Sequence, residues 1–507
     1  MLRFSRKNTD INEIILYEDR FNSIAGKLKL AGILRARGFD AAILMQNAFD
    51  AAFITWLAGI PERIGYSRDY RKLLLTKAIP VRKTGDKGQG TRGKGQEKEH
   101  HVYYYLNLLK DALNIEPANI EPLIYLTEEE INHAKTLLNS SLVPCLPSRQ
   151  ARPLPTEQAG SSLVIGINPG AAYGSAKRWM PEKFAEVICR IINELNGSVV
   201  VFGSKSEIEI VNKIIQNAEY RTCLPDRQAQ YADNPPHPPF DKGGMGGILN
   251  MAGKTNLREL AALISECDAF ITNDSGPMHM ASALLVPVVA IFGSTDSKIT
   301  GPIGKRHKIV SRNIACSPCL KRECPVSTTR SREGHLKCLA DITADDVFSA
   351  LKELLPKEKA VFLDRDGTII EDAGYLNSFS KLKIFDGVKE NLKKLKKAGF
   401  KLIGITNQSG VARGLVSEEF VTASNAYLQK TLGIDDFYFC PHHPDDACQC
   451  RKPETMLLRK ARLKHGIMLK SSYVIGDKSS DVIMAKKAGS KGILVQTGHD
   501  SESEQAD

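Results

Sequence analysis

Two aspartates stand two residues apart where a predicted β-strand ends. The apolar run at 361–363 leads directly into the motif Asp364-Arg-Asp-Gly-Thr368. In open α/β sheets, ligands bind beyond the carboxyl ends of the strands, so Asp364 and Asp366 can both address one phosphoryl group. Aspartate and glycine also favour ordinary turns, and the motif alone leaves that interpretation open.

Two later predicted strands end in residues that complete a phosphate site. The strand at 401–405 runs into Thr406-Asn-Gln-Ser-Gly410, which offers a hydroxyl, side-chain amides and backbone N–H groups to phosphate oxygens. The strand at 473–475 is followed by Asp477. Carboxylates at two strand ends suit Mg²⁺, and Lys452 supplies a cation for the phosphoryl group. The pattern predicts magnesium-dependent phosphotransfer.

Three thiols and two imidazoles lie within eleven residues just before Lys452. One imidazole and three thiolates suit a closed tetrahedral Zn²⁺ site, with His443 left over. Such a site has no open position, so we expect zinc to hold the loop and place Arg451 and Lys452 at the pocket rim. An exposed loop with incidental thiols is the alternative. The expected zinc ligands are Cys440, His442, Cys448 and Cys450.

Over residues 358–498 the order of these motifs resembles the haloacid dehalogenase-like phosphatases. The resemblance implies that Asp364 attacks phosphorus to form an aspartyl-phosphate, while Asp366 protonates the leaving oxygen and then activates water. Thr406 and Lys452 would hold the phosphate. The implied magnesium site consists of Asp364, the carbonyl of Asp366 and Asp477, supported by Asp481.

The cysteine loop, together with Asn407-Gln-Ser-Gly-Val-Ala-Arg-Gly414, resembles D-glycero-D-manno-heptose 1,7-bisphosphate 7-phosphatases and the related histidinol-phosphate phosphatases. Heptose bisphosphate is the substrate that we expect, and histidinol phosphate is the alternative. The implied substrate contacts are Asn407, Gln408, Ser409, Arg413 and Arg451.

Two glycine-containing turns earlier in the chain are typical of diphosphate sites. Gly166-Ile-Asn-Pro-Gly-Ala-Ala-Tyr-Gly-Ser-Ala-Lys-Arg-Trp179 follows the strand at 163–167 and precedes a helix at 181–195. Ser275 and Gly276 follow the strand at 269–272 and open a second helix. Free N–H groups at a helix start bind anions. Each turn alone also fits a plain strand-to-helix junction.

Together with Asn250-Met-Ala-Gly253 and Phe292-Gly-Ser294, these turns resemble the ADP-heptose:lipopolysaccharide heptosyltransferases of glycosyltransferase family 9, most like heptosyltransferase II, over residues 18–355. The resemblance implies a GT-B pair of Rossmann-like domains, with ADP-heptose on the second domain and the lipopolysaccharide core, at the inner-membrane face, on the first. The implied donor contacts are Asn168, Gly170, Lys177, Asp274, Ser275, Gly276 and His279.

Family members open with a strand and a Gly-Asp loop that carries the catalytic aspartate. The resemblance here begins near Tyr17-Glu-Asp-Arg-Phe21, so we expect an N-terminally truncated transferase and assign it no catalytic base. The predicted α/β organisation is a truncated acceptor-side domain, a donor domain and a phosphatase domain. Their bounds are 1–155 with a low-complexity insert at 81–101, 156–355 with a Pro/Gly-rich insert at 225–247, and 356–507.

Composition limits the cellular compartment and the classes of ligand that we expect for this protein. Eleven cysteines, scattered or in two tight groups, indicate a reducing cytoplasm rather than a disulfide framework. No apolar run is long enough to span a bilayer, which allows at most peripheral association with the inner membrane. The net charge of +11 suits phosphorylated ligands, while the absence of a basic stripe interleaved with aromatics argues against nucleic acid. The second cysteine group, either a metal site or incidental thiols, is Cys316, Cys319, Cys324 and Cys338.

Two functional hypotheses follow. In the first, the chain is a bifunctional enzyme of lipopolysaccharide heptose metabolism, with a 7-phosphatase fused to a heptosyltransferase. In the second, only the phosphatase is active, and the transferase-like half is non-catalytic.

Overall fold

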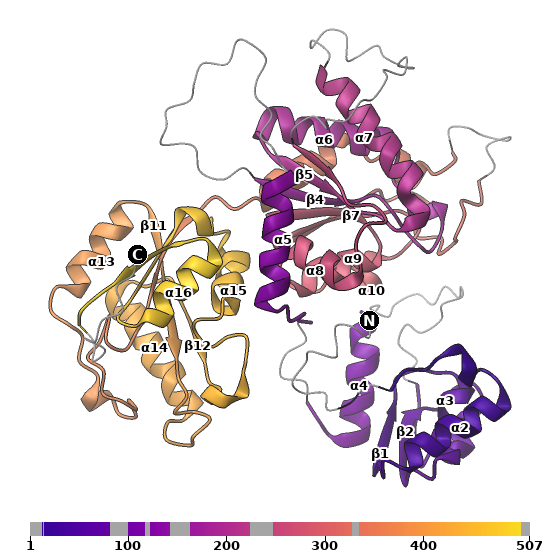
Figure 1. The fold of residues 1–507 in the computed structure, drawn as a ribbon, viewed down its shortest axis with the longest axis horizontal. Coiled ribbons are helices and arrows are strands. Elements are labelled where there is room, and N and C mark those ends of the chain that lie inside the picture. Colours follow the sequence, from indigo (N-terminus) through magenta and orange to yellow (C-terminus); the bar gives the residue numbers. More distant parts are fainter. Residues whose placement is uncertain are drawn as a thin grey trace.

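A computed structural model describes residues 13, 15–81, 100–116, 122–141, 163–223, 247–326 and 334–497 of the 507. Three parallel β-sheets, each flanked by helices, follow one another along the chain (Figure 1). Both predicted inserts lie almost entirely outside the described residues. None of the helices in the described part of the chain is long and apolar enough to cross a membrane.

The first unit is a three-stranded sheet of order β1-β2-β3. Ser23 caps its first long helix by accepting a hydrogen bond from Gly26 N at 3.1 Å. Phe21, Leu30 and Ile54 are buried where that helix packs on the next one. The elements are η1 (Asp19–Phe21), α2 (Ile24–Arg35), β1 (Ala41–Leu44), α3 (Phe49–Leu57), β2 (Glu62–Tyr66), η2 (Arg71–Leu74), β3 (Lys77–Ile79) and α4 (His101–Leu113).

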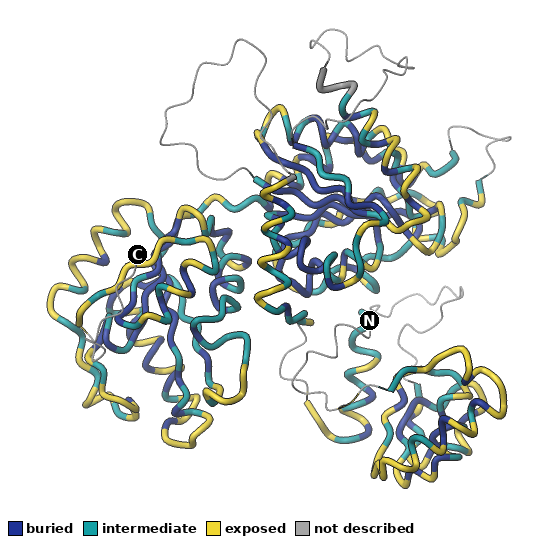
Figure 2. Tube along the Cα trace, viewed as in Figure 1, coloured by how far each residue is buried: buried dark blue, intermediate teal, exposed yellow. Residues whose placement is uncertain are grey.

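The central unit is a six-stranded sheet of order β6-β5-β4-β7-β8-β9 with helices on both faces. Four of its strands are buried along their whole length, which explains their continuous apolar sequences (Figure 2). The strands are β4 (Val164–Asn168), β5 (Ser198–Val201), β6 (Ile248–Asn250), β7 (Ala269–Asn273), β8 (Val288–Phe292) and β9 (His307–Ser311).

Helix α5 (Glu128–Ser141) packs on the central unit, because Ala134 and Leu138 join its core and Glu130 pairs with Arg258. The predicted boundary at 155 grouped this helix with the first domain. The other helical elements here are η4 (Ser175–Lys177), α6 (Pro181–Leu195), η5 (Lys205–Glu207), α7 (Ile208–Cys223), α8 (Leu257–Ser265), α9 (Gly276–Ala283), α10 (Ser297–Thr300), α11 (Lys337–Ala340) and α12 (Ala344–Leu354).

The C-terminal unit is a five-stranded sheet of order β12-β11-β10-β13-β14 with a separate apolar core on each face. Its strands are β10 (Lys359–Leu363), β11 (Phe400–Asn407), β12 (Asp436–Cys440), β13 (Tyr473–Gly476) and β14 (Lys491–Leu494). Its helices are η7 (Phe379–Lys381), α13 (Val388–Lys397), α14 (Glu418–Leu432), η8 (Pro444–Asp446), α15 (Met456–His465), η9 (Leu469–Ser471) and α16 (Ser479–Ala488).

Short apolar runs in the sequence predict strands at 41–45, 163–167, 198–202, 269–272, 288–292, 361–363, 401–405 and 473–475. The structure confirms these strands, and each end lies within two residues of its predicted position. The sequence also predicts helices at 181–195 and 344–355, which are present as α6 and α12.

Candidate active sites

The register of the C-terminal sheet places the predicted catalytic residues at one edge. Leu363, the last residue of the central strand β10, pairs with Gly404 of β11 and Ile475 of β13. Asp364, Thr406 and Asp477 therefore emerge side by side, as the sequence predicts. The pocket at this edge is lined by Asp364, Asp366, Asp372, Gly374, Tyr375, Thr406, Asn407, Gln408, Ser409, Gly410, Arg451, Lys452, Lys478 and Ser480.

Lys452 lies buried between two carboxylates. Its Nζ is 2.7 Å from Asp364 Oδ1 and 2.7 Å from Asp481 Oδ1. Burial alone would lower the pKa of Lys452, but the two carboxylates outweigh it and raise that pKa, so the ammonium stays charged. A fixed positive charge thus stands beside the predicted nucleophile.

Asp364, Asp477 and Asp481 form a buried acidic group whose oxygens lie within 4.8 Å of one another. Neither carboxylate oxygen of Asp477 has a hydrogen-bond donor among the described residues. Burial, followed by the nearby Asp364, raises the pKa of Asp477 to about 7. Gly367, at φ +83°, makes room for this carboxylate, because a Cβ there would lie 2.3 Å from Asp477 Oδ2. Unsatisfied buried carboxylate oxygens at this spacing fit a divalent cation.

Asp366 is held apart from that group by three donors. The Arg365 guanidinium makes a two-pronged contact with its carboxylate, Nε to Oδ2 at 3.0 Å and Nη2 to Oδ1 at 3.1 Å. Gln408 Nε2 donates to Asp366 Oδ2 at 2.8 Å, and Thr406 Oγ1 donates to the same oxygen at 3.2 Å. These contacts hold the carboxylate of Asp366 in one orientation, while its proton-transfer role and its carbonyl contact with magnesium stay predictions.

Arg365 is a functional residue that the sequence analysis missed. It is almost completely buried, and its Nη1 donates to Ser424 Oγ and Asn425 Oδ1 of α14. Because α14 lies about 60 residues further along the chain, no local motif signals this contact.

Four of the five predicted substrate contacts line the pocket, and the fifth, Arg413, does not; the four are Asn407, Gln408, Ser409 and Arg451. Asn407 exchanges hydrogen bonds with the backbone of Lys452, accepting from its N at 3.0 Å, so it positions the lysine. Ser409 and Arg451 line the pocket, and Arg451 Nη1 is buried without a hydrogen-bond partner among the described residues. Arg413 is exposed and is not one of the lining residues.

The four predicted zinc ligands converge. The donor atoms of Cys440, His442, Cys448 and Cys450 all lie within 4.8 Å of one another, with Cys440 Sγ 3.4 Å from Cys448 Sγ. The hydrogen bond with Cys450 lowers the pKa of the Cys440 thiol to about 5, which favours a thiolate. His443 instead caps η8 and accepts from Asp445 N, as expected of the unused imidazole.

In the central unit, both predicted turns meet at the carboxyl ends of β4 and β7. Lys177 Nζ lies 2.5 Å from Asp274 Oδ2, and Thr295 Oγ1, a residue that the sequence analysis did not select, donates to the same oxygen at 2.6 Å. Asn168 Nδ2 donates to Gly170 O at 3.3 Å and to Ser275 Oγ at 3.4 Å. The two turns therefore form one polar site.

Gly276 and His279 are exposed and lie on the first turn of α9, beside Ser275.

The second cysteine group is not gathered in the same way as the first. Among the described residues, the two clusters that bring three or more metal-ligand atoms within 4.8 Å are the zinc-loop set and the acidic group.

Two family models match the chain in different parts. Residues 27–329 match glycosyltransferase family 9 (heptosyltransferase), and residues 449–507 match the HAD-hydrolase-like family. The first match covers more than half of the chain. The chain belongs to glycosyltransferase family 9. A crystal structure of a family 9 glycosyltransferase from Veillonella parvula DSM 2008, 22% identical, covers 69% of this chain and 85% of that chain with a TM-score of 0.51. This likeness agrees with the predicted pair of Rossmann-like units.

The C-terminal unit has relatives of its own. D-glycero-beta-D-manno-heptose-1,7-bisphosphate 7-phosphatase of Photorhabdus laumondii is 41% identical over 163 residues, which are 29% of this chain and 86% of the relative. The C-terminal unit belongs to that phosphatase family, so the predicted fusion of two enzyme families is confirmed.

The transferase side is matched over a smaller share of its relatives. Lipooligosaccharide heptosyltransferase 2 of Campylobacter jejuni subsp. jejuni serotype O:2 is 30% identical over 261 residues, which are 51% of this chain and 65% of the relative. The chain thus spans slightly less than two thirds of that relative's length.

Proposed function

We propose that this chain is a bifunctional enzyme of lipopolysaccharide inner-core heptose metabolism. The C-terminal unit removes the 7-phosphate from D-glycero-D-manno-heptose 1,7-bisphosphate, and the first two units transfer heptose from ADP-heptose to the lipopolysaccharide core. The observation that carries the phosphatase assignment is the convergence of Asp364, Lys452 and Asp477 at one strand edge. Family membership of both parts supports the pairing.

The phosphatase reaction has two steps. A carboxylate oxygen of Asp364 attacks phosphorus while the bond to the sugar oxygen breaks, and Asp366 gives that oxygen a proton. Asp366 then takes a proton from water, which attacks phosphorus and releases inorganic phosphate and free Asp364. Lys452 offsets negative charge on Asp364 and on the transferring group throughout.

Asp364 and Asp477, with Asp481 beside them, would hold Mg²⁺. The ion supplies charge neutralisation for the phosphoryl oxygens. The cysteine loop would hold Zn²⁺ through Cys440, His442, Cys448 and Cys450 in a structural role. Bound there, the ion would hold the loop that precedes Lys452.

For the transferase, we assign the diphosphate of ADP-heptose to the polar site at the ends of β4 and β7. The start of α9 at Ser275 and the charged Lys177 both face this site, and both suit an anionic ligand. The acceptor is a membrane lipid, so we place the enzyme in the cytoplasm at the inner-membrane face. The net charge of +11 is compatible with an anionic surface.

Two assays test the proposal. Phosphate release by the full chain with Mg²⁺ should be faster from heptose 1,7-bisphosphate than from histidinol phosphate, and Asp364→Asn should abolish it. A preference for histidinol phosphate would contradict the substrate assignment. ADP release from ADP-heptose with a heptosylated core acceptor tests transfer, and absence of ADP beside a working phosphatase would favour the non-catalytic transferase-like half.

A further inference from the structure

Two helices of the C-terminal unit connect its catalytic residues with the central unit. Helix α15 begins four residues after Lys452, and α16 begins two residues after Asp477 and carries Asp481 in its first turn. Farther along, both helices contact the central unit, toward which α15 faces (Figure 1). Because a helix moves as one body, contacts along α15 and α16 affect the position of the catalytic groups near the starts of these helices.

Two arginines on one face of α15 make the main polar contacts. Arg459 Nη2 lies 3.0 Å from Glu266 Oε1, and its Nη1 donates to Ser265 O at 3.1 Å. One turn later, Arg462 Nη2 lies 2.7 Å from Asp268 Oδ1. All four charged side chains are at most 23% exposed, so these pairs are better shielded than ordinary surface ion pairs.

The central unit offers these arginines a rigid attachment. Asp268 precedes β7, and its Oδ2 accepts from Val164 N at the start of β4 at 2.9 Å. The donor-binding residues Asn168 and Asp274 lie at the opposite ends of the same two strands. Docking at this edge therefore leaves the proposed donor site open.

Helix α16 is attached through its last turn. Lys487 Nζ lies 3.0 Å from Glu128 Oε2 of the central unit and 3.1 Å from Glu454 Oε1, two residues after Lys452. Lys135 Nζ of α5 donates to Lys487 O at 2.8 Å. One lysine thus joins α16, the segment that starts α15 and the neighbouring unit.

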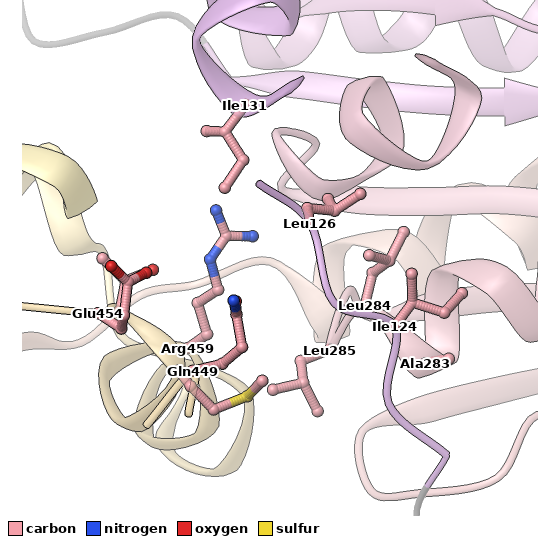
Figure 3. Close-up of a pocket in the computed structure, with 11 residues that line it drawn as sticks. Ile124, Leu126, Ile131, Ala283, Leu284, Leu285, Gln449, Glu454 and Arg459 are labelled. Atoms are coloured by element: carbon pink, nitrogen blue, oxygen red, sulfur yellow. The ribbon is translucent and has the colours of Figure 1, made fainter. Parts of the chain in front are cut away.

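An apolar cleft lies beside these polar contacts (Figure 3). Leu126 and Ile131 of the central unit stand across it from Gln449 and Arg459 of the C-terminal unit. Gln449 belongs to the cysteine loop, so the junction extends from α15 to the zinc-ligand segment.

The connection between the units is short and also tied to α15. Helix α12 ends at Leu354 and β10 begins at Lys359. Within this connection, Lys357 N and Glu358 N both donate to Gly466 O, just after α15. Arg306 packs directly on Gly466, where a Cβ would lie 2.0 Å from its Nη1. Both ends of the helix are thereby held.

We propose that the central unit is the platform on which the phosphatase is assembled, and that Arg459 and Arg462 are positioning residues that hold α15 and, through it, Lys452. The inference rests on the proposed phosphatase function. It assigns the phosphatase domain an interaction surface whose partner is the glycosyltransferase domain of the same chain. Catalytic groups need sub-ångström placement, so release of α15 weakens transition-state stabilisation more than substrate binding.

The sharpest test changes only the central unit. Glu266 lies outside the phosphatase fold, so Glu266→Arg in the full chain disturbs the junction and leaves the phosphatase sequence unchanged. We expect it to lower the phosphatase kcat about tenfold, with KM for the bisphosphate within about twofold. The charge swap Glu266→Arg with Arg459→Glu should restore at least half of the kcat. Glu209→Arg, at an exposed position of α7, and Lys460→Glu on α15 are matched controls that should leave kcat unchanged. Glu266→Gln removes the charge without introducing repulsion, and it serves as the test if Glu266→Arg misfolds. Near-ultraviolet circular dichroism verifies the fold of each variant.

Equal kcat values for wild type, Glu266→Arg and Glu266→Gln would overturn the positioning role, as would a loss that the charge swap does not restore. An inactive wild-type chain would instead refute the proposed phosphatase function. In that case, faster amide hydrogen exchange along α15 in Glu266→Arg would still support the docking surface, and unchanged exchange would reject it.

Discussion

Lys452 compensates two buried carboxylates at once. Its ammonium contacts Asp364 and Asp481 equally closely, so a neutral residue leaves both negative charges without a partner. We predict that Lys452→Met reduces phosphate release more than a hundredfold and lowers the free energy of unfolding of the C-terminal unit by about 3–5 kcal/mol. Steady-state kinetics and urea unfolding measure both effects. A variant with normal activity would exclude Lys452 from the mechanism.

Arg365 and Arg413 make a matched pair of arginines with opposite expectations. Arg365 is buried and orients Asp366, whereas Arg413 is exposed outside the pocket lining. We predict that Arg365→Met lowers kcat about ten- to a hundredfold, because the proton donor loses its orientation. Arg413→Met should change kcat/KM less than twofold. A larger effect at Arg413 would restore it as a substrate contact and contradict the placement seen here.

At this scale the sequence predicts residues that follow strand ends and misses residues whose role depends on distant packing. Asp364, Thr406 and Asp477 could be found because parallel strands end at one sheet edge. Arg365 could not, since only the packing of α14 shows its partners. The hydrogen bond from the Lys452 backbone to the Asn407 amide was also not foreseen, and the substrate contact of Asn407 stays a prediction.

At the level of single elements, the cysteine loop brings four potential metal ligands within 4.8 Å of one another. The first of its metal-ligand residues, Cys440, is the last residue of β12, and the last, Cys450, lies two residues before Lys452. We predict that Cys448→Ser lowers bound zinc from about one ion per chain to nearly none, and lowers both kcat and the thermal midpoint of the C-terminal unit. Elemental analysis and differential scanning calorimetry measure these quantities. Full activity without zinc would remove the proposed structural role.

Strand β9 carries a titratable residue that links the stability of the central unit to pH. His307 Nδ1 accepts from Val288 N at 3.2 Å, and burial lowers the pKa of His307 to about 4. The unfolded chain, with a pKa near 6.5, binds a proton first as pH falls, so stability is full above pH 6.5 and is lost between 6.5 and about 4.

We predict that proton binding by His307 in the unfolded chain lowers the free energy of unfolding of the central unit by about 2 kcal/mol when the pH falls from 7.5 to 5. Urea unfolding of wild type and His307→Gln, followed at both pH values, isolates this contribution. The substituted chain should lose about 2 kcal/mol less over the same interval. Identical pH dependence of the two proteins would contradict the buried neutral imidazole.

Four strands that are buried on both faces were predicted from their apolar runs, whereas the edge strands β12 and β14 were not. β4, β5, β7 and β8 are continuous apolar runs, and each was predicted. In contrast, β14 is exposed along its length and β12 is only partly buried, and neither was predicted although each contains a short apolar run. Their places in the sheet depend on pairing with β13 and β11, which sequence periodicity does not reveal.

In the molecule as a whole, two enzyme families share one chain, and their units meet at one junction of charged side chains. The sequence indicated the fusion through two sets of motifs, but the junction is built from charged side chains on α15, α16 and the segment before β7. Charged residues on helices usually face solvent, so their sequence positions carried no sign of an interface.

The central claim is that the chain removes phosphate through a covalent intermediate on Asp364. The most direct measurement is acid quenching during turnover of heptose 1,7-bisphosphate, followed by peptide mass spectrometry of the strand-end segment. We predict a phosphoryl group on Asp364 in the wild-type chain and none in Asp364→Asn. Continued phosphate release with no label on Asp364, or with the label on another residue, would contradict the account.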